Sequence, residues 1–239
     1  MPYYYYGFDW TYLVLILPCM IFAMIASSNV NSTFKKYSTQ YSLRRITGAE
    51  AARWVLQHNG VTGVRIERVS GKLTDHYDPK ANVIRLSDSV YDSTSTAAIG
   101  VAAHEAGHAV QYAREYAPIK LRAAIIPLTN FGSKLAMPLI LLGILLAAFG
   151  GFSTILVDLG IAAFGLSFVF QLITLPVEFN ASRRAIQTIE DAQLLTAEEQ
   201  RGARKTLRAA AMTYVAAMAV ALAQLIRLIM IFGNNRRRD

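Results

Sequence analysis

Two of the four histidines in the chain, His104 and His108, lie four residues apart, and Glu105 directly follows the first. If this segment is helical, both imidazoles lie on one face about one turn apart and can bind one metal ion. Neutral imidazole suits zinc, and a glutamate at this spacing can accept a proton from metal-activated water. We therefore interpret His104 and His108 as zinc ligands and Glu105 as a catalytic base.

The alternative is an ordinary helix with two surface histidines. A chance match to this pattern is expected in about one chain in a hundred or fewer at this length. The surrounding segment is rich in alanine and carries few charges, whereas an exposed helical face normally carries Lys and Glu. The single cysteine, Cys19, excludes a zinc cage built from cysteines and a disulfide scaffold. The pattern thus favours a catalytic zinc site.

A zinc peptidase site needs a third protein ligand, and the pool is His58, His76 and the acidic residues. Glu178 is the first choice, because Pro176 suits the first turn of a helix and the glutamate would then face the end of a membrane span. Two membrane crossings between His108 and Glu178 would return the chain to the same side. The alternative is that Glu178 only stabilises a helix N-terminus, and the residues leave both readings open.

The composition is that of a membrane protein, with 54% hydrophobic and 17% charged residues. Soluble domains have about 45–50% and 25%, and disordered chains are far less apolar. The net charge of +8 comes from cations beside apolar runs, as membrane insertion favours. No base-reading motif accompanies them, so we expect no nucleic-acid partner. The apolar runs are long enough to span a membrane and lie at 10–27, 125–150, 151–175 and 209–232.

The first run is interpreted as an anchor and not as a signal peptide. A signal peptide carries Lys or Arg before its apolar run, and no Lys or Arg precedes this one. Tyr3 to Tyr6 suit the membrane interface, and Lys35 and Lys36 after the run place the N-terminus outside. Residues 33–122 would then be cytoplasmic. Four spans would leave Arg236 to Arg238 outside, against the usual trend.

Residues 33–117 form a small α+β unit. Thr47 and Glu50 match a capping box ahead of a helix that ends near His58. Alternating residues predict strands at 64–69 and 82–87, with a turn at 77–79 between them. A helix over 93–116 carries the histidines. Because strand 82–87 precedes that helix, we hypothesise that it accepts substrate as an added β-strand.

The predicted fold class is a mainly α membrane protein with about four transmembrane helices and a small α+β zincin-like catalytic unit. The expected segments are an N-terminal transmembrane anchor, the α+β unit, a transmembrane hairpin, a helix with the third metal ligand, and a C-terminal transmembrane helix with a basic tail. In the same order, these five segments cover residues 1–32, 33–117, 118–175, 176–208 and 209–239.

The segments His104-Glu-Ala-Gly-His108 and Val177-Glu-Phe-Asn-Ala-Ser-Arg-Arg-Ala185 together resemble the YugP-like family of membrane zinc metallopeptidases, over nearly the whole chain. The chain is similar, more distantly, to HtpX-type and CAAX prenyl proteases, whose third ligand lies in a Glu-x-x-Ala-Asp pattern. The resemblance implies Glu178 as the third ligand. Ser182 stands where those distant relatives have aspartate, so a serine would supply the hydrogen bond to a zinc-binding histidine.

Peptide hydrolysis passes through an oxyanion that needs a hydrogen-bond donor beside the metal. Candidate donors outside the ligand set are His76, Tyr77, Asn180, Arg183 and Arg184. A simpler interpretation of His76 is that it is a polar loop residue. The two arginines have a simpler reading as charges at the end of a span.

These observations predict a membrane-embedded zinc metalloendopeptidase with one Zn²⁺ per chain and its active site on the cytoplasmic side of a bacterial-type cell membrane. The expected partners are the lipid bilayer and membrane-associated or misfolded protein substrates. One alternative is a metal-binding regulator or chaperone-like protein without proteolysis, which would not need Glu105. Another alternative is a transporter in which Lys134, Asp158 and Arg227 line a path. The sequence gives no sign of the paired broken helices that are typical of transporters.

Overall fold

The computed structural model describes residues 10–233. Tyr3 to Tyr6 and Arg236 to Arg238, on which part of the topology prediction depends, lie outside the described residues. The chain divides into two compact units. The described residues of the first are 10–25, 124–172 and 215–233, and the second comprises Ala26–Ala123 and Ile173–Tyr214.

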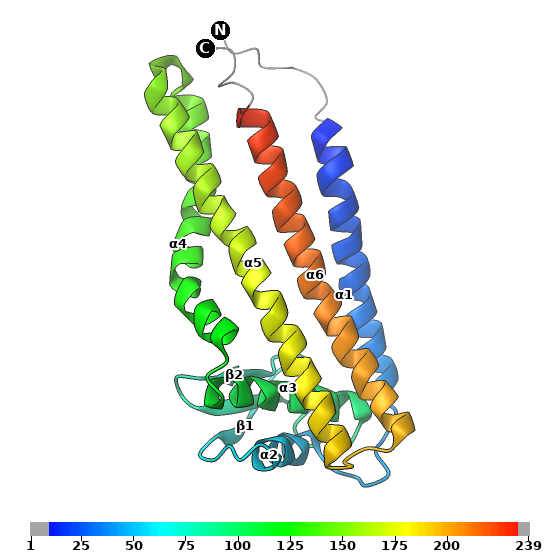
Figure 1. Ribbon diagram of the computed structural model, residues 1–239. Helices are drawn as coiled ribbons and strands as arrows, with labels where there is room; N and C mark the ends of the chain where they lie inside the picture. Colours follow the sequence, from blue (N-terminus) through cyan, green and yellow to red (C-terminus); the bar gives the residue numbers. More distant parts are fainter. Residues whose placement is uncertain (1–9, 234–239) are drawn as a thin grey trace. The chain divides into compact units, whose positions relative to one another are not determined.

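Four helices in the described part of the chain are long enough and apolar enough to cross a membrane. This is the number that the apolar runs predict (Figure 1). Gly150, with a φ of 62°, turns the chain between the second and third of them, after the short helix η2 (Ala147–Phe149). The helices are α1 (Leu17–Tyr37), preceded by the π-helical segment η1 (Tyr12–Ile16), α4 (Ala117–Leu145), α5 (Gly151–Asp191) and α6 (Ala197–Gly233).

The structure divides residues 176–208 differently from the sequence prediction. Pro176 lies inside α5 rather than in the first turn of a new helix. A proline removes only one backbone donor, and long apolar helices tolerate this because neighbouring groups satisfy the freed carbonyl. The segment from Ala197 onward is the beginning of α6. Glu178 is therefore carried by a continuous helix of 41 residues.

In the first unit, α4 and α5 pack closely through glycines. A Cβ at Gly160 would lie 2.8 Å from the carbonyl oxygen of Ala136, and one at Gly143 would lie 2.9 Å from that of Ser153. The Ser153 hydroxyl donates a hydrogen bond of 2.7 Å to the Gly143 carbonyl. Small residues at helix contacts are typical of membrane hairpins, in which close backbone approach stabilises the pair.

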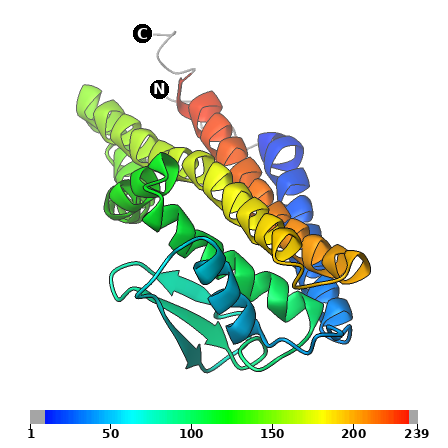
Figure 2. The same cartoon turned by 60° about the horizontal axis from the view of Figure 1, so that its bottom comes forward.

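The second unit contains a three-stranded sheet with the order β1-β3-β2, and Figure 2 shows α2 and α3 beside it. Strand β3 pairs in parallel with β1 and antiparallel with β2. Helix α2 begins with the predicted capping box, in which Thr47 and Glu50 each bond the other's backbone N–H. The elements are α2 (Gly48–His58), β1 (Arg65–Val69), β2 (His76–Asp78), β3 (Val83–Ser87) and α3 (Thr96–Ala113).

Strand β3 is the central strand, and this contradicts the hypothesis that substrate adds beside residues 82–87. Its residues Val83 to Arg85 are paired on both sides, by β1 and by β2. Beyond β2, the Ser87 N–H donates to the Asp75 carboxylate. The backbone groups that an added strand would need are therefore already used. The predicted turn at 77–79 is mostly strand β2, which is too short to show an alternating pattern.

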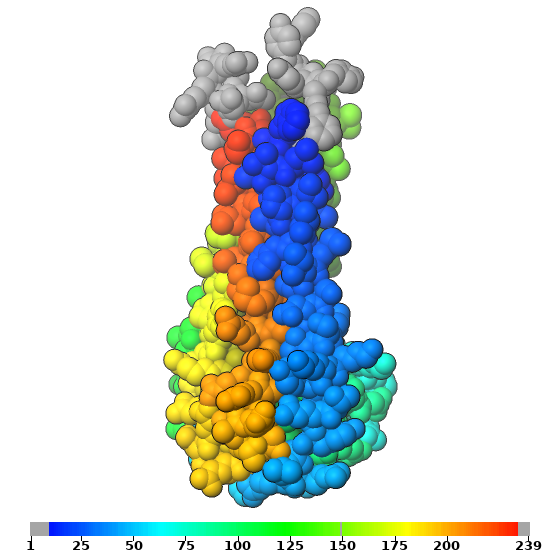
Figure 3. All heavy atoms as spheres, turned by 90° about the vertical axis from the view of Figure 1, so that its right-hand side faces the viewer, coloured from blue at the N-terminus to red at the C-terminus, as the bar shows by residue number. Residues whose placement is uncertain are grey.

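Helix α3 lies in the buried core of the second unit, where two glycines allow its backbone to approach other helices. A Cβ at Gly107 would lie 2.7 Å from the carbonyl oxygen of Ala181 in α5, and one at Gly100 would lie 3.2 Å from Ala203 in α6. The last part of α1 lies beside the first part of α6 (Figure 3), where a Cβ at Gly202 would approach the Tyr37 ring. These contacts fix the helices that carry the candidate site.

Candidate metal centre

His104, His108 and Glu178 converge from α3 and α5, with one possible ligand atom of each within 4.8 Å of the others. Glu178 Oε2 lies 3.3 Å from His104 Nε2 and 3.6 Å from His108 Nε2. The Glu178 residue is only 2% exposed. The structure thus brings together the three residues that the sequence and the resemblance single out as ligands.

The chemistry of this cluster fits a divalent metal ion. Apart from the two imidazoles, the buried Glu178 Oε2 has no hydrogen-bond partner among the described residues. A buried carboxylate oxygen without a partner is costly, and a bound cation would remove that cost. Two imidazoles and one carboxylate are also a typical protein ligand set of catalytic zinc sites, which keep a further position open.

The tautomer of His108 is set by the buried side chain of Gln111, one turn further along α3. The Gln111 amide nitrogen donates to the Val177 carbonyl at 2.8 Å and to Asn180 Oδ1 at 3.0 Å. Its oxygen therefore accepts the hydrogen of His108 Nδ1 at 3.0 Å. In the neutral ring, the lone pair is therefore on His108 Nε2, toward Glu178, as metal binding requires.

Burial by itself lowers the pKa of His108, but contact with Glu178 and the nearby charge of Glu105 outweigh it, and the pKa is raised. The ring therefore holds a proton more firmly than a free imidazole does. A metal ion must displace that proton, so metal binding is expected to weaken as the pH falls.

His104 has a comparable partner on α5. Its Nδ1 lies 3.1 Å from the Ser182 hydroxyl. If the hydroxyl accepts the Nδ1 hydrogen, Nε2 is free to bind metal. Ser182 lies one turn after Glu178 on the same helix, so α5 supplies both a candidate ligand and the group that orients another. Ser182 thus lies where it can supply the hydrogen bond that the aspartate of the distant relatives would supply.

The second oxygen of Glu178 is held by Arg122, near the beginning of α4. Arg122 Nη1 donates to Glu178 Oε1 at 3.1 Å, while Oε2 faces the histidines. The arginine thereby fixes which oxygen is presented to the metal. Sequence analysis did not find Arg122, because no motif surrounds it.

We expect Arg122→Met to weaken zinc binding about 10- to 100-fold, the usual cost of losing a partner that orients a metal ligand. Zinc affinity is measured by competition with a chelator. Lys120→Met is the matched control, because Lys120 lies on the same helix and pairs with the exposed Glu115. Equal or tighter zinc binding by the Arg122 variant would contradict this role.

A cavity of about 280 Å³ adjoins two of the three candidate ligands, His104 and Glu178. Glu105 lines it beside His104 and Glu178, and Tyr214 of α6 lines it from another side. A substrate group in this cavity would therefore meet a carboxylate base and a hydroxyl donor next to the candidate ligands. Sequence analysis missed Tyr214, since it stands within an apolar run.

Asp75, in the loop before β2, also lines this cavity. It accepts hydrogen bonds from the Ser87 N–H at 2.7 Å and the Ser87 hydroxyl at 3.0 Å. The pKa of Asp75 is raised, mainly because the carboxylate is buried. The two hydrogen bonds from Ser87 lower the pKa, and the negative charge of Glu105 raises it further. The loop is thus fastened to β3 while it forms a wall of the cavity.

The other candidate donors lie elsewhere. Ser182 lines the cavity, but Asn180, His76, Tyr77, Arg183 and Arg184 are not among the residues that form its wall. Asn180 accepts from Gln111 and Arg184. His76 is exposed on β2, with Nδ1 2.8 Å from the Thr74 carbonyl oxygen.

Long apolar helices and a cluster of two histidines and a glutamate fit a membrane-associated metallopeptidase, and the comparison with known families supports this class. The model of the family described as "Putative neutral zinc metallopeptidase" matches residues 12–233, and the chain belongs to this family. The chain is also 45% identical over 225 residues to "Putative membrane protease YugP" of Bacillus subtilis (strain 168). That alignment covers 94% of this chain and 98% of the relative. No solved structure matches the chain. The family resemblance found in the sequence is therefore confirmed.

Proposed function

We propose that this protein is a membrane-embedded zinc endopeptidase whose catalytic centre is the cluster of His104, His108 and Glu178. The observation that carries the proposal is the buried Oε2 of Glu178, which lies 3.3 Å and 3.6 Å from the Nε2 atoms of two imidazoles beside a cavity that Glu105 also lines. Family membership supports the same activity. A regulator that only binds metal would not need a carboxylate base at the position of Glu105.

In the proposed reaction, His104, His108 and Glu178 hold one zinc ion in a zincin-like arrangement. When bound, zinc polarises the scissile carbonyl and lowers the pKa of water. Glu105 accepts the proton of the attacking water and transfers it to the leaving amine. Tyr214 lines the same cavity and is our candidate to donate a hydrogen bond to the carbonyl oxygen as negative charge develops.

The proposed substrates are membrane-associated or misfolded proteins, because the catalytic residue Glu178 lies on a helix that is itself a candidate membrane span. We place the site on the cytoplasmic side of a bacterial-type membrane. Cations gather where the apolar runs end, at Lys35, Lys36, Arg183, Arg184 and Arg208. Such flanks normally remain in the cytoplasm.

The test is the zinc content of the purified full-length protein, measured by elemental analysis. We expect one zinc ion per chain in the wild type, and its loss in both His104→Ala and Glu178→Ala, because each removes a ligand. His58→Ala is the control, since His58 is exposed at the end of α2. Zinc loss in His104→Ala alone would assign the third ligand elsewhere. A wild type without zinc, even after reconstitution, would overturn the peptidase proposal.

A further inference from the structure

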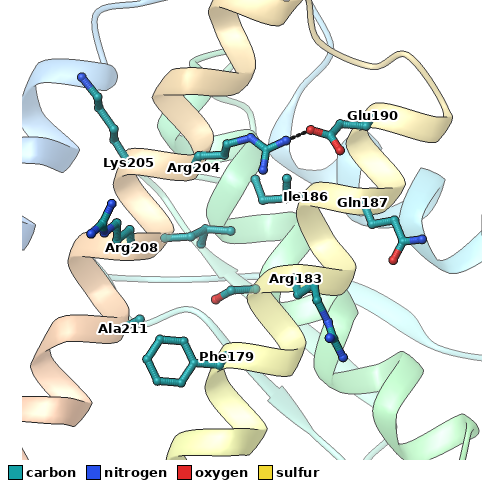
Figure 4. A pocket seen from close by; sticks show the side chains of 11 residues that line it. Phe179, Arg183, Ile186, Gln187, Glu190, Arg204, Lys205, Arg208 and Ala211 are labelled. Carbon is teal, nitrogen blue, oxygen red and sulfur yellow. Dashed lines mark ion pairs between the residues drawn. The ribbon is translucent and has the colours of Figure 1, made fainter.

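A groove of about 620 Å³ lies between the last part of α5 and the first part of α6 (Figure 4). Its base is apolar and includes Phe179, Ile186 and Leu207. Figure 4 shows the Phe179 ring between the two helices, near Ala211. The groove is distinct from the catalytic cavity, although a few side chains border both.

The rim of this groove has a strong excess of positive charge. Arg204 pairs with Glu190 across the groove (Figure 4). The other cations of the rim are Arg183, Lys205 and Arg208, all of them exposed. No carboxylate lies within ion-pair distance of these three among the described residues. Figure 4 shows Arg208 on α6 and Arg183 on α5 on the two sides of the groove, whereas Lys205 extends away from α5. Arg183 and Arg208 therefore provide two uncompensated charges that flank the groove for an anionic ligand.

The polar and apolar parts of the groove are ordered along the two helices. Along the sequence of α5, Phe179 is nearer than Arg183 to the apolar run at 151–175. On α6, Ala211 lies within the apolar run at 209–232, whereas Lys205 precedes it. The apolar end thus continues into the candidate spans, and the charged end lies where both spans finish. A ligand that matches this order has an anionic head and an apolar tail.

A second groove shows that the cations are concentrated at this level of the helices. It lies between α1 and α6, has a volume of about 310 Å³, and shares Lys205 and Arg208 with the first. Lys36 of α1 contributes a further cation. Clusters of basic residues beside a membrane span are the usual recognition elements for anionic lipid headgroups.

We propose that the α5–α6 groove binds one anionic phospholipid. Its phosphate lies between Arg183 and Arg208, and an acyl chain lies along Phe179 and Ala211. Leu207 and Ala211 line both this groove and the catalytic cavity, so the lipid packs against residues that form the cavity wall. This binding site goes beyond the proposed peptidase activity and does not depend on it.

The test is the binding of phosphatidylglycerol and phosphatidylcholine with identical acyl chains to the full-length protein in detergent, measured by native mass spectrometry. We expect the wild type to prefer phosphatidylglycerol. The variant Arg183→Gln/Arg208→Gln is expected to bind it about 25-fold more weakly, at about fivefold for each cation removed beside an anionic headgroup. Arg183→Lys/Arg208→Lys keeps the charge and should retain most of the binding.

The control Lys35→Gln/Arg53→Gln removes the same charge from exposed positions outside the groove and is expected to bind like the wild type. If the double glutamine variant does not fold, Arg208→Gln alone replaces it, with an expected fivefold loss. Equal binding of the two lipids by the wild type, or equal loss in the control, would overturn the proposal. Displacement of the lipid by an equal concentration of inorganic phosphate or a glutamate-rich peptide would assign the groove to those ligands instead.

Discussion

Replacement of Glu105 by glutamine is expected to lower kcat/KM for peptide cleavage by a factor of about 10²–10⁴, the usual contribution of general acid–base catalysis. Zinc content and thermal stability should remain those of the wild type. Glutamine has the shape of glutamate but cannot accept a proton from water. Glu105 lines the catalytic cavity without belonging to the three-residue ligand cluster, so its replacement leaves the ligands in place.

The measurement is the cleavage of a fluorogenic peptide by the detergent-purified enzyme, with zinc determined in the same samples. Glu115→Gln is the matched control, because Glu115 carries the same charge but is exposed and pairs with Lys120. Full activity in the Glu105 variant would show that another group takes the proton. Loss of zinc together with activity would show that Glu105 supports the metal centre itself.

The replacement Gly107→Ala is expected to destroy the metal centre although it changes no ligand. The added Cβ would lie 2.7 Å from the backbone oxygen of Ala181, a distance that forces α3 and α5 apart. Such overpacking typically costs about 1–3 kcal/mol of folding free energy. His104 and His108 lie on α3, whereas Glu178 lies on α5. Moving the two helices apart should therefore lower zinc affinity by more than the replacement Arg122→Met does.

Zinc affinity and Tm of the purified variant provide the measurement. Gly165→Ala is the control on α5, where the nearest neighbour of an added Cβ, in Leu225, is 3.9 Å away. That change should leave zinc binding intact, because the position has room and alanine is a better helix former than glycine. A Gly107→Ala variant with normal zinc affinity would show that α3 and α5 can separate without loss of the site.

The parts of this protein that depend on local spacing could be predicted from the sequence. The capping box at Thr47 and the pair His104 and His108 each lie within one helical turn, where side-chain positions follow from the backbone. Glu178 is distant in sequence, so the residues alone left its role open. The family resemblance was needed to favour it.

The contacts between distant segments could not be predicted in this way. Arg122 and Tyr214 belong to long helices whose composition is dominated by the apolar environment, and no spacing connects them to Glu178. Strand β2 is too short for a periodic pattern, and its pairing made β3 a central strand. Pro176 is a stop signal in soluble helices, yet α5 continues through it because membrane helices tolerate proline.

The continuity of α5 also sets the order in which the centre can be completed during biosynthesis. The two histidines emerge from the ribosome early, on α3, whereas Glu178 follows only after α4 and most of α5 have been made. With Glu178 as the proposed third ligand, the nascent chain has only two of its three zinc ligands until the hairpin has been synthesised. The proposed peptidase centre would then form only after most of its own polypeptide has been made.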